Sequence, residues 1–272
     1  MTGEQGGATV RGPDSWVAIG DSFTEGLSDL SADGVNYVGW ADRLAEMLAA
    51  RNPAFRYANL ALRGKMLQEI IDEQLPFAMA AKPDLVTICA GGNDVVTPGS
   101  DVDWVADKFE QAIAELAAAV PTVVIFTGPD PKALPLVRTV RGKVAIYNGH
   151  VRGIADRHGV KLVDLWSMDV LHDRRAWSDD RLHFSAEGHR RIALCLAEML
   201  GIPINADWRQ PWPPASPSRW LSSRRDDLNW TRTHLLPWVR RQIQGTSMGD
   251  GLAPKRPELT PLADERARRE MA

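Results

Sequence analysis

The stretch VAIGDSFTEG, residues 17–26, runs from an apolar segment into Gly-Asp-Ser and ends on a second glycine. A short apolar run of this kind is typical of a buried strand, and the Gly and Asp-Ser that follow are typical of its end. Taken alone, the pattern fits a structural turn, because Gly, Asp and Ser favour turns for conformational reasons. It also fits a nucleophilic serine, which would need a histidine base, an orienting acid and oxyanion donors elsewhere in the chain.

Outward from this stretch, short apolar runs alternate with longer amphipathic segments as far as about residue 200. This alternation is typical of βα units around a mostly parallel sheet. Strands are predicted at residues 16–20, 56–61, 84–90, 122–128 and 161–166. Helices are predicted at residues 37–52, 66–81, 104–119, 142–159 and 185–201. We therefore predict an α/β fold, a three-layer α/β/α sandwich with a flavodoxin-like five-stranded parallel sheet, whose functional groups gather at the carboxyl ends of the strands.

Composition places the chain among ordinary globular proteins, with 272 residues, 44% hydrophobic and 25% charged. Its net charge of −3 argues against nucleic acid or an anionic membrane as partner. No apolar stretch approaches the length of a membrane span and the N-terminal residues lack an apolar core, so we expect a cytoplasmic protein without integral membrane association. The two cysteines, Cys89 and Cys195, are interpreted as small core residues. The oligomeric state stays unknown at this point.

The chain is expected to divide into three parts: a flexible N-terminus at residues 1–14, a catalytic domain at residues 15–203, and a Trp/Pro/Arg-rich extension at residues 204–272. The composition changes sharply after Pro203, since residues 207–272 hold five of the ten tryptophans and twelve Lys/Arg against eight Asp/Glu. We expect the Trp-rich part to wrap its own domain, with one helix at residues 227–244. The end from residue 255 is predicted to be a loose segment, and its last dozen residues are predicted to be disordered.

The predicted strand ends carry residues that would form a hydrolytic triad. Ser22 would be the nucleophile, and its hydroxyl needs a neighbouring base to remove the proton during attack. His183 is the best base in the sequence, and Asp180 lies three residues before it, so that a turn would bring its carboxylate onto the imidazole. Asp179 is a weaker alternative for the orienting acid.

Three groups at the same strand ends are candidate donors to a developing oxyanion. These are the backbone N–H of Ser22, the backbone N–H of Gly64 and the side-chain amide of Asn93. Glycine allows a close backbone approach, and an amide is a neutral donor at any pH.

With these residues in view, the sequence resembles the SGNH hydrolases, the GDSL-type esterase and lipase family. The resemblance covers residues 16 to about 200 and rests on four blocks in order, namely GDSFTEG, NLALRG, GGND and DRLH, which contain Ser22, Gly64, Asn93 and the Asp180/His183 pair. Phe23 stands where the family name has leucine. The family implies ester hydrolysis through an acyl-serine intermediate, without metal or cofactor, on small-molecule, glycan or lipid esters.

Two other functions remain open: an acyltransferase that uses the same residues, and a non-catalytic binding module on the same scaffold. A second serine pattern, GTSMG at residues 245–249, matches the G-x-S-x-G elbow around Ser247. We interpret it as a loop, because no buried strand precedes it. The remaining histidines lack comparable partners in the sequence and are interpreted as structural: His150, His158, His172, His189 and His234.

Overall fold

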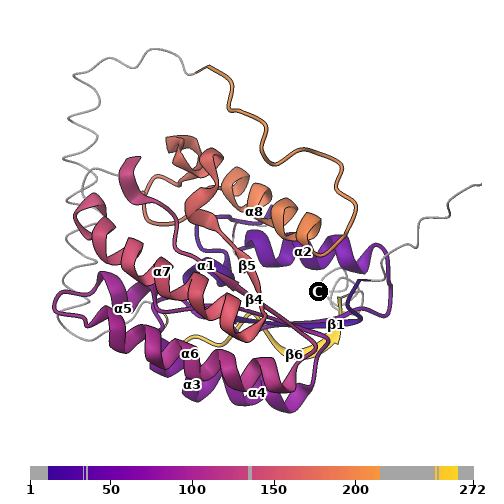
Figure 1. Ribbon diagram of the computed structural model, residues 1–272. Coiled ribbons are helices and arrows are strands. Elements are labelled where there is room, and N and C mark those ends of the chain that lie inside the picture. Colours follow the sequence, from indigo (N-terminus) through magenta and orange to yellow (C-terminus); the bar gives the residue numbers. More distant parts are fainter. Residues whose placement is uncertain are drawn as a thin grey trace, which may run out of the picture.

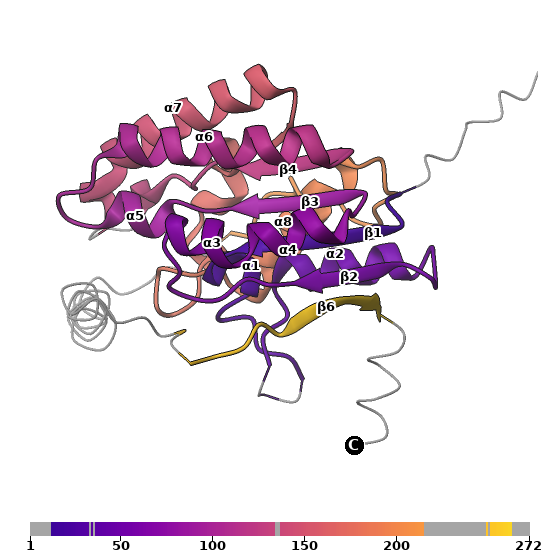
Figure 2. The ribbon, with the colours of Figure 1, turned by 90° about the horizontal axis from the view of Figure 1, so that it is seen from below.

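In the described part of the chain, six strands form a single sheet in the order β5–β4–β3–β1–β2–β6. Figure 1 shows this sheet among its helices, and Figure 2 shows β4, β3, β1, β2 and β6 side by side. The computed structural model describes residues 12–32, 34, 36–133, 137–214, 249 and 251–262. The strands are β1 (Ser15–Gly20), β2 (Arg56–Asn59), β3 (Leu85–Cys89), β4 (Thr122–Phe126), β5 (Lys161–Val163) and β6 (Arg256–Pro261). The first five pair in parallel, which confirms the predicted α/β sandwich.

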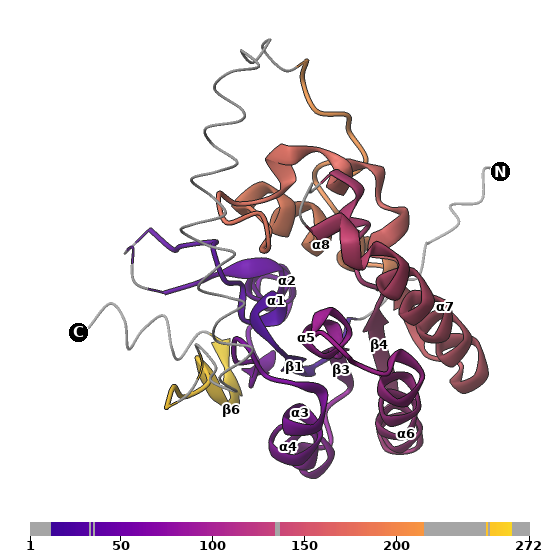
Figure 3. The same ribbon diagram turned by 90° about the vertical axis from the view of Figure 1, so that its left-hand side faces the viewer.

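Helices cover both faces of the sheet, as Figure 3 shows. One face is covered by α2 (Gly39–Ala49) and α8 (Ala186–Met199). The other is covered by α3 (Leu67–Glu73), α4 (Leu75–Ala81), α6 (Val102–Ala119) and α7 (Arg141–His158). Because β1 is central, its side chains alternate between two buried cores, with Trp16 in one and Val17 in the other. The short helices α1 (Ser22–Glu25) and α5 (Gly92–Val96) follow β1 and β3 directly.

The helix predicted at residues 66–81 is in fact two helices, α3 and α4, which meet at Gln74. Pro76, in the first turn of α4, explains the break, because proline has no N–H to donate and its ring clashes with the preceding turn. The break places the buried Gln74 side chain against the end of β1. There it accepts a hydrogen bond from Gly20 N at 2.8 Å and donates one to Gly20 O at 3.0 Å.

The prediction of five strands is wrong by one, because residues 256–261 form β6, antiparallel to β2 at the edge of the sheet (Figure 2). This segment is part of the end that was expected to be loose. Apolar and polar residues alternate only weakly in this segment. Its strand conformation is fixed by the pairing with β2 and by the buried Arg256, whose guanidinium Nε donates to Tyr57 O at 3.1 Å. Neither contact can be read from the sequence of residues 255–272.

The start of the extension packs along α8. Trp208 Nε1 donates to Glu198 at 2.9 Å, and Trp212 Nε1 donates to Val170 O at 2.7 Å. Arg191 lies 4.4 Å from the Trp212 ring centroid. The helix predicted at residues 227–244, the N-terminal residues 1–11 and residues 263–272 lie outside the described residues. In the part of the chain that is described, no helix is long and apolar enough to cross a membrane.

Candidate active site

Ser22 is the first residue of α1, directly beyond the carboxyl end of β1. Asp21 caps this helix, since its Oδ1 accepts a hydrogen bond from Phe23 N at 3.0 Å. The strand, the cap and the short helix turn the chain sharply, so that Ser22 lies at the edge of the sheet where the other strands also end. Each neighbouring parallel strand adds its own terminal loop to this edge.

The structure brings Ser22, His183 and Asp180 into one line of hydrogen bonds. His183 Nε2 lies 3.0 Å from Ser22 Oγ, across 161 positions of sequence, and His183 Nδ1 lies 2.6 Å from Asp180 Oδ2. Asp179, the weaker candidate for the acid, is exposed to solvent. This is the arrangement that a histidine needs in order to take a proton from a serine while a carboxylate orients its ring.

A tight turn explains why Asp180 faces the histidine three residues later. Ser178 N donates to His183 O at 2.9 Å, and Arg181 takes a left-handed conformation with φ 55° inside the turn. Asp180 Oδ1 accepts the backbone N–H groups of Leu182 and His183, at 2.9 and 3.0 Å. The carboxylate is therefore held by the same turn that carries the imidazole.

The electrostatic setting of Asp180 keeps it ionised. Burial alone would raise its pKa, but the hydrogen bond and charge of His183, with a hydrogen bond from Ser178, hold the pKa of this carboxyl well below its usual range. Ser28 Oγ also donates to Asp180 Oδ2, at 3.2 Å. Neither serine was among the predicted site residues, because lone serines in polar loops carry no distinguishing signal.

Asn93 contacts the residues that neighbour the other two candidate oxyanion donors in the sequence. Asn93 Nδ2 donates to Lys65 O, the residue after Gly64, at 2.9 Å, and lies 3.4 Å from Asp21 Oδ2, the residue before Ser22. Gly64 has φ 79°, a left-handed conformation that glycine adopts readily.

Asp21 is a buried carboxyl beneath the site, and its importance was not predicted from the GDS sequence. Burial raises its pKa from 3.8 to about 6, against the lowering effects of the Phe23 N–H and of His183. A group with this pKa changes charge close to neutral pH, directly beside the Ser22–His183 pair.

A cavity of about 230 Å³ opens beside Ser22 and His183. It extends on the side of β3 and β4, between α5, α7 and the loop that carries His183. Its walls are mostly apolar side chains, including Val96, Phe126, Val144, Tyr147, Trp177 and Leu182. Such a cavity suits an apolar group far better than a polyhydroxylated one, because buried hydroxyls need hydrogen-bond partners.

The histidines His150, His158 and His189 lie outside the Ser22–His183–Asp180 line of hydrogen bonds. His150 and His158 pair with Asp103 and Glu110 at the surface. His189 is buried and lines the cavity, accepts a hydrogen bond from Trp40 N at 3.2 Å, and has its pKa lowered to about 3 by burial. The described residues contain no group of three or more His, Cys, Asp and Glu side chains placed to hold a metal ion. His234 and Ser247 lie outside the described residues.

Residues 18–191 match the GDSL-like Lipase/Acylhydrolase family. The match confirms the resemblance inferred from the four sequence blocks. No functionally curated protein matches the chain in sequence.

Solved structures with a similar fold include the acetylxylan esterase Axe2 from Geobacillus stearothermophilus, with a TM-score of 0.59 and 20% identity over 74% of this chain and 98% of that one. Further structures of Axe2 are of catalytic mutants in which alanine replaces a serine, an aspartate or a histidine. LAE5, an alpha/beta hydrolase enzyme from the metagenome of Lake Arreo in Spain, has a TM-score of 0.54 and 23% identity over 71% of this chain and 98% of that one. At these identities the likeness establishes the fold.

Proposed function

The chain belongs to the GDSL-like lipase/acylhydrolase family and is an ester-bond hydrolase, and from this premise we propose that it acts as a serine esterase through an acyl-serine intermediate. The observation that supports this mechanism best is His183, whose two ring nitrogens contact Ser22 Oγ and Asp180 Oδ2 at 3.0 and 2.6 Å. One imidazole that bridges a hydroxyl and a half-buried carboxylate is the arrangement required for nucleophilic catalysis by serine.

Acylation is the first half of the proposed reaction. Ser22 Oγ attacks the ester carbonyl carbon while His183 Nε2 takes the hydroxyl proton, and Asp180 stabilises the imidazolium that forms. The carbonyl oxygen becomes an oxyanion that accepts hydrogen bonds from Ser22 N, Gly64 N and Asn93 Nδ2. The C–O bond to the alcohol then breaks, and His183 gives its proton to the departing alkoxide, which leaves as the free alcohol.

Deacylation repeats these steps with water as the nucleophile. His183 Nε2 takes a proton from water as its oxygen attacks the acyl-serine carbonyl. The second tetrahedral intermediate collapses with return of the proton to Ser22 Oγ, which releases the carboxylic acid and restores the enzyme.

The cavity supports an acyl group longer than acetyl as the favoured substrate. Its apolar walls begin beside Ser22, where the carbonyl carbon must lie, and continue to Val144 and Tyr147 on α7. Each methylene buried there would contribute about 0.8 kcal/mol, which is about fourfold in kcat/KM. We therefore expect kcat/KM to rise from p-nitrophenyl acetate to p-nitrophenyl hexanoate.

The mechanism is tested by intact-mass measurement after incubation with a fluorophosphonate. We expect one adduct on the wild type and on Ser247→Ala, and none on Ser22→Ala. The same three proteins are then assayed for hydrolysis of p-nitrophenyl esters, with Ser22→Ala expected to be inactive. Labelling that persists in folded Ser22→Ala, or that is lost in Ser247→Ala, would contradict Ser22 as the nucleophile.

A further inference from the structure

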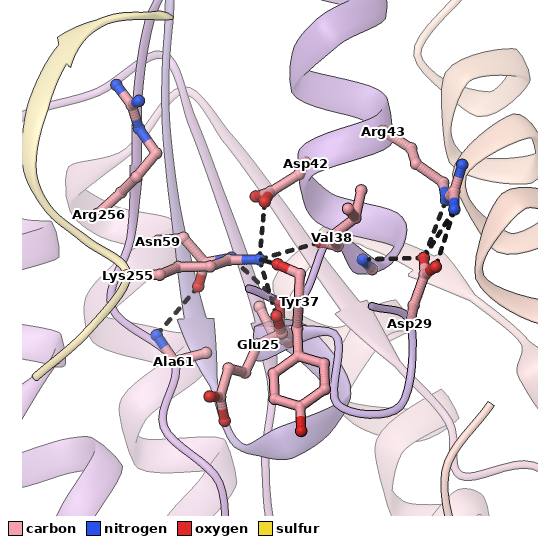
Figure 4. Close-up of polar contacts among 12 residues, drawn as sticks. Glu25, Asp29, Tyr37, Val38, Asp42, Arg43, Asn59, Ala61, Lys255 and Arg256 are labelled. Atoms are coloured by element: carbon pink, nitrogen blue, oxygen red, sulfur yellow. Dashed lines mark hydrogen bonds and ion pairs between the residues drawn. The ribbon is translucent and has the colours of Figure 1, made fainter. Parts of the chain in front are cut away.

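Lys255 lies just before β6 and reaches the base of the helix that carries Ser22, 230 positions away from Glu25 in the sequence. Its Nζ lies 2.7 Å from Glu25 O, 3.2 Å from Tyr37 O and 2.9 Å from Val38 O. A fourth oxygen, Asp42 Oδ2, lies at 2.9 Å. Figure 4 shows this ammonium group among the four acceptors, which we call the carbonyl cage.

Two glycines allow the carbonyl cage to form. Gly26 ends α1 with φ 90°, and Gly39 begins α2 with φ 73°. A Cβ atom placed on Gly26 would lie 2.6 Å from Gly39 Cα, so only glycine permits this approach. The approach brings the last carbonyl of α1 beside the carbonyls of Tyr37 and Val38. Oxygens that converge in this way, with a carboxylate among them, are stabilised by a cation, and the Lys255 ammonium group supplies both the charge and the N–H donors.

Glu25 connects the cage to the helix that carries the nucleophile and to the loop that carries Gly64, without direct contact between Lys255 and either. Glu25 is the last residue of the four-residue helix that begins at Ser22, so holding its carbonyl holds the whole of α1. The Glu25 carboxylate is buried, accepts Arg63 N at 2.8 Å and forms an ion pair with the Arg63 guanidinium. Gly64, a candidate oxyanion donor, is the next residue. One residue thus links Lys255 to two parts of the site.

The cage also anchors the loop that leads from α1 to α2. Tyr37 and Val38 lie at its far end, and near its beginning Ser28 donates to Asp180 Oδ2 at 3.2 Å. Asp29 is the second anchor of this loop, since it accepts Gly39 N at 3.1 Å and pairs with Arg43. A shift at Tyr37 and Val38 would therefore be transmitted toward the carboxylate of the triad.

Strand β6 fixes where the ammonium group lies. Arg256, the neighbour of Lys255, is buried against β2 and donates to Tyr57 O at 3.1 Å. Asp42 contributes its second oxygen, Oδ1, to a hydrogen bond from the Tyr57 hydroxyl at 2.9 Å. The cation therefore reaches the cage from a paired strand with little freedom to move.

We propose that Lys255 is a positioning residue for the esterase reaction. The C-terminal strand β6 places the ammonium group of Lys255 under α1, and this group holds Ser22 and Gly64 in the positions that the reaction needs. This inference rests on the proposed function. Lys255 touches neither the nucleophile nor the cavity, so its loss is expected to lower kcat and to leave KM nearly unchanged. Small displacements of catalytic groups lower rates by up to about a hundredfold, and we expect a loss between about tenfold and a hundredfold.

The experiment compares Lys255→Ala with the wild type in p-nitrophenyl butyrate hydrolysis, with and without added n-propylammonium. This ion replaces the three carbons and the nitrogen that the substitution removes. We expect it to restore part of kcat, whereas tetramethylammonium, which has the same charge and no N–H donors, is expected to restore none. Unchanged kcat in Lys255→Ala, or equal rescue by both ions, would overturn the proposal.

Two further variants separate positioning from general stability. Leu116→Ala removes a fully buried side chain of α6 and is expected to lower the melting temperature with kcat unchanged. Glu258→Ala changes an exposed side chain of β6 and is expected to change neither the melting temperature nor kcat. If Leu116→Ala lowers kcat as much as Lys255→Ala does, Lys255 is only a stabilising residue.

Failure of the proposed function is distinguishable from failure of this inference. A wild type that is neither labelled by fluorophosphonate nor active on esters would disprove the esterase mechanism. The positioning role is then decided by amide hydrogen exchange at residues 22–39. Faster exchange in Lys255→Ala that n-propylammonium reverses would support the role of Lys255, and unchanged exchange would refute it.

Discussion

At the scale of single residues, Asp21 shows how a group beside the nucleophile affects stability. The residue is 8% exposed, and burial raises the pKa of its carboxyl from 3.8 to about 6. Between these two pH values the folded state keeps a proton that the unfolded chain has lost. The contribution of Asp21 to stability is therefore greatest at low pH, and it falls by up to about 3 kcal/mol as the pH rises from about 4 through 6.

We expect Asp21→Asn to be more stable than the wild type at pH 8, by an amount that shrinks toward zero near pH 4. Asparagine is an equally good N-cap, so the contact to Phe23 N is kept. The measurement is the urea midpoint of both proteins from pH 4 to pH 8. Asp179→Asn, at an exposed aspartate of the histidine loop, is the matched control. A stability difference between the two proteins that does not vary with pH would contradict a raised pKa at Asp21.

The main site residues could be predicted because each lies in a short motif at a strand end. Ser22, Asn93 and His183 follow or flank patterns that are visible in the sequence, and parallel strands bring such ends together. Ser28 could not be predicted, since its contact with Asp180 spans 152 positions and depends on how one loop folds. Lys255 was missed for the same reason, because its four acceptors are mostly backbone carbonyls.

At the scale of elements, the break between α3 and α4 serves the end of β1. It lets the 3% exposed Gln74 side chain satisfy both backbone groups of Gly20, two residues before Ser22. The sequence shows Pro76 but not the contact. From the sequence, one continuous helix is predicted, because apolar residues recur on one helix face of residues 66–81.

We expect Gln74→Leu to lower the free energy of unfolding by about 1–3 kcal/mol. The substitution keeps a similar volume but leaves the buried N–H of Gly20 without its partner, whereas Gly20 O still accepts a hydrogen bond from Leu62 N at 3.3 Å. Urea titration measures the loss. Gln68→Leu, at an exposed position of α3, should stay within about 0.5 kcal/mol of the wild type. Equal midpoints for the two variants would show that Gly20 finds other partners.

Helix α7 forms a rigid wall of the cavity. The Asn148 amide both donates to Gly128 O and accepts from Gly128 N, each at 2.8 Å, and the Tyr147 hydroxyl donates to Ala90 O at 3.0 Å. These contacts fix α7 against the ends of β3 and β4. Val144 on the same helix lines the cavity, so its size should set the length of acyl chain that fits.

We expect Val144→Phe to lower the ratio of kcat/KM for hexanoate over acetate by about tenfold or more, because the larger ring occupies the space of several methylenes. Activity on acetate should change little. Ile146→Phe is the control, since Ile146 lies on the same helix and is 55% exposed. An unchanged ratio in Val144→Phe would place the acyl chain elsewhere.

At the scale of the whole molecule, the extension is joined to the catalytic sheet rather than appended to it. The alternation of apolar and amphipathic segments was enough to predict the parallel strands and their covering helices. It could not predict β6, because an edge strand is defined by its pairing with β2 more than by its own composition. The same pairing places Lys255 in the carbonyl cage.

Two shortened chains test whether the sheet and the active site depend on β6 and Lys255. A chain ending at residue 262 keeps β6 and every described contact, so we expect the melting temperature and the ester turnover of the full chain. A chain ending at residue 254 loses β6 and Lys255, which exposes the N–H and C=O groups of β2 and empties the cage. We expect it to melt at lower temperature, to associate through the open edge in size-exclusion chromatography, and to lose most of its turnover. Equal behaviour of the two chains would mean that the sheet and the site are complete without β6.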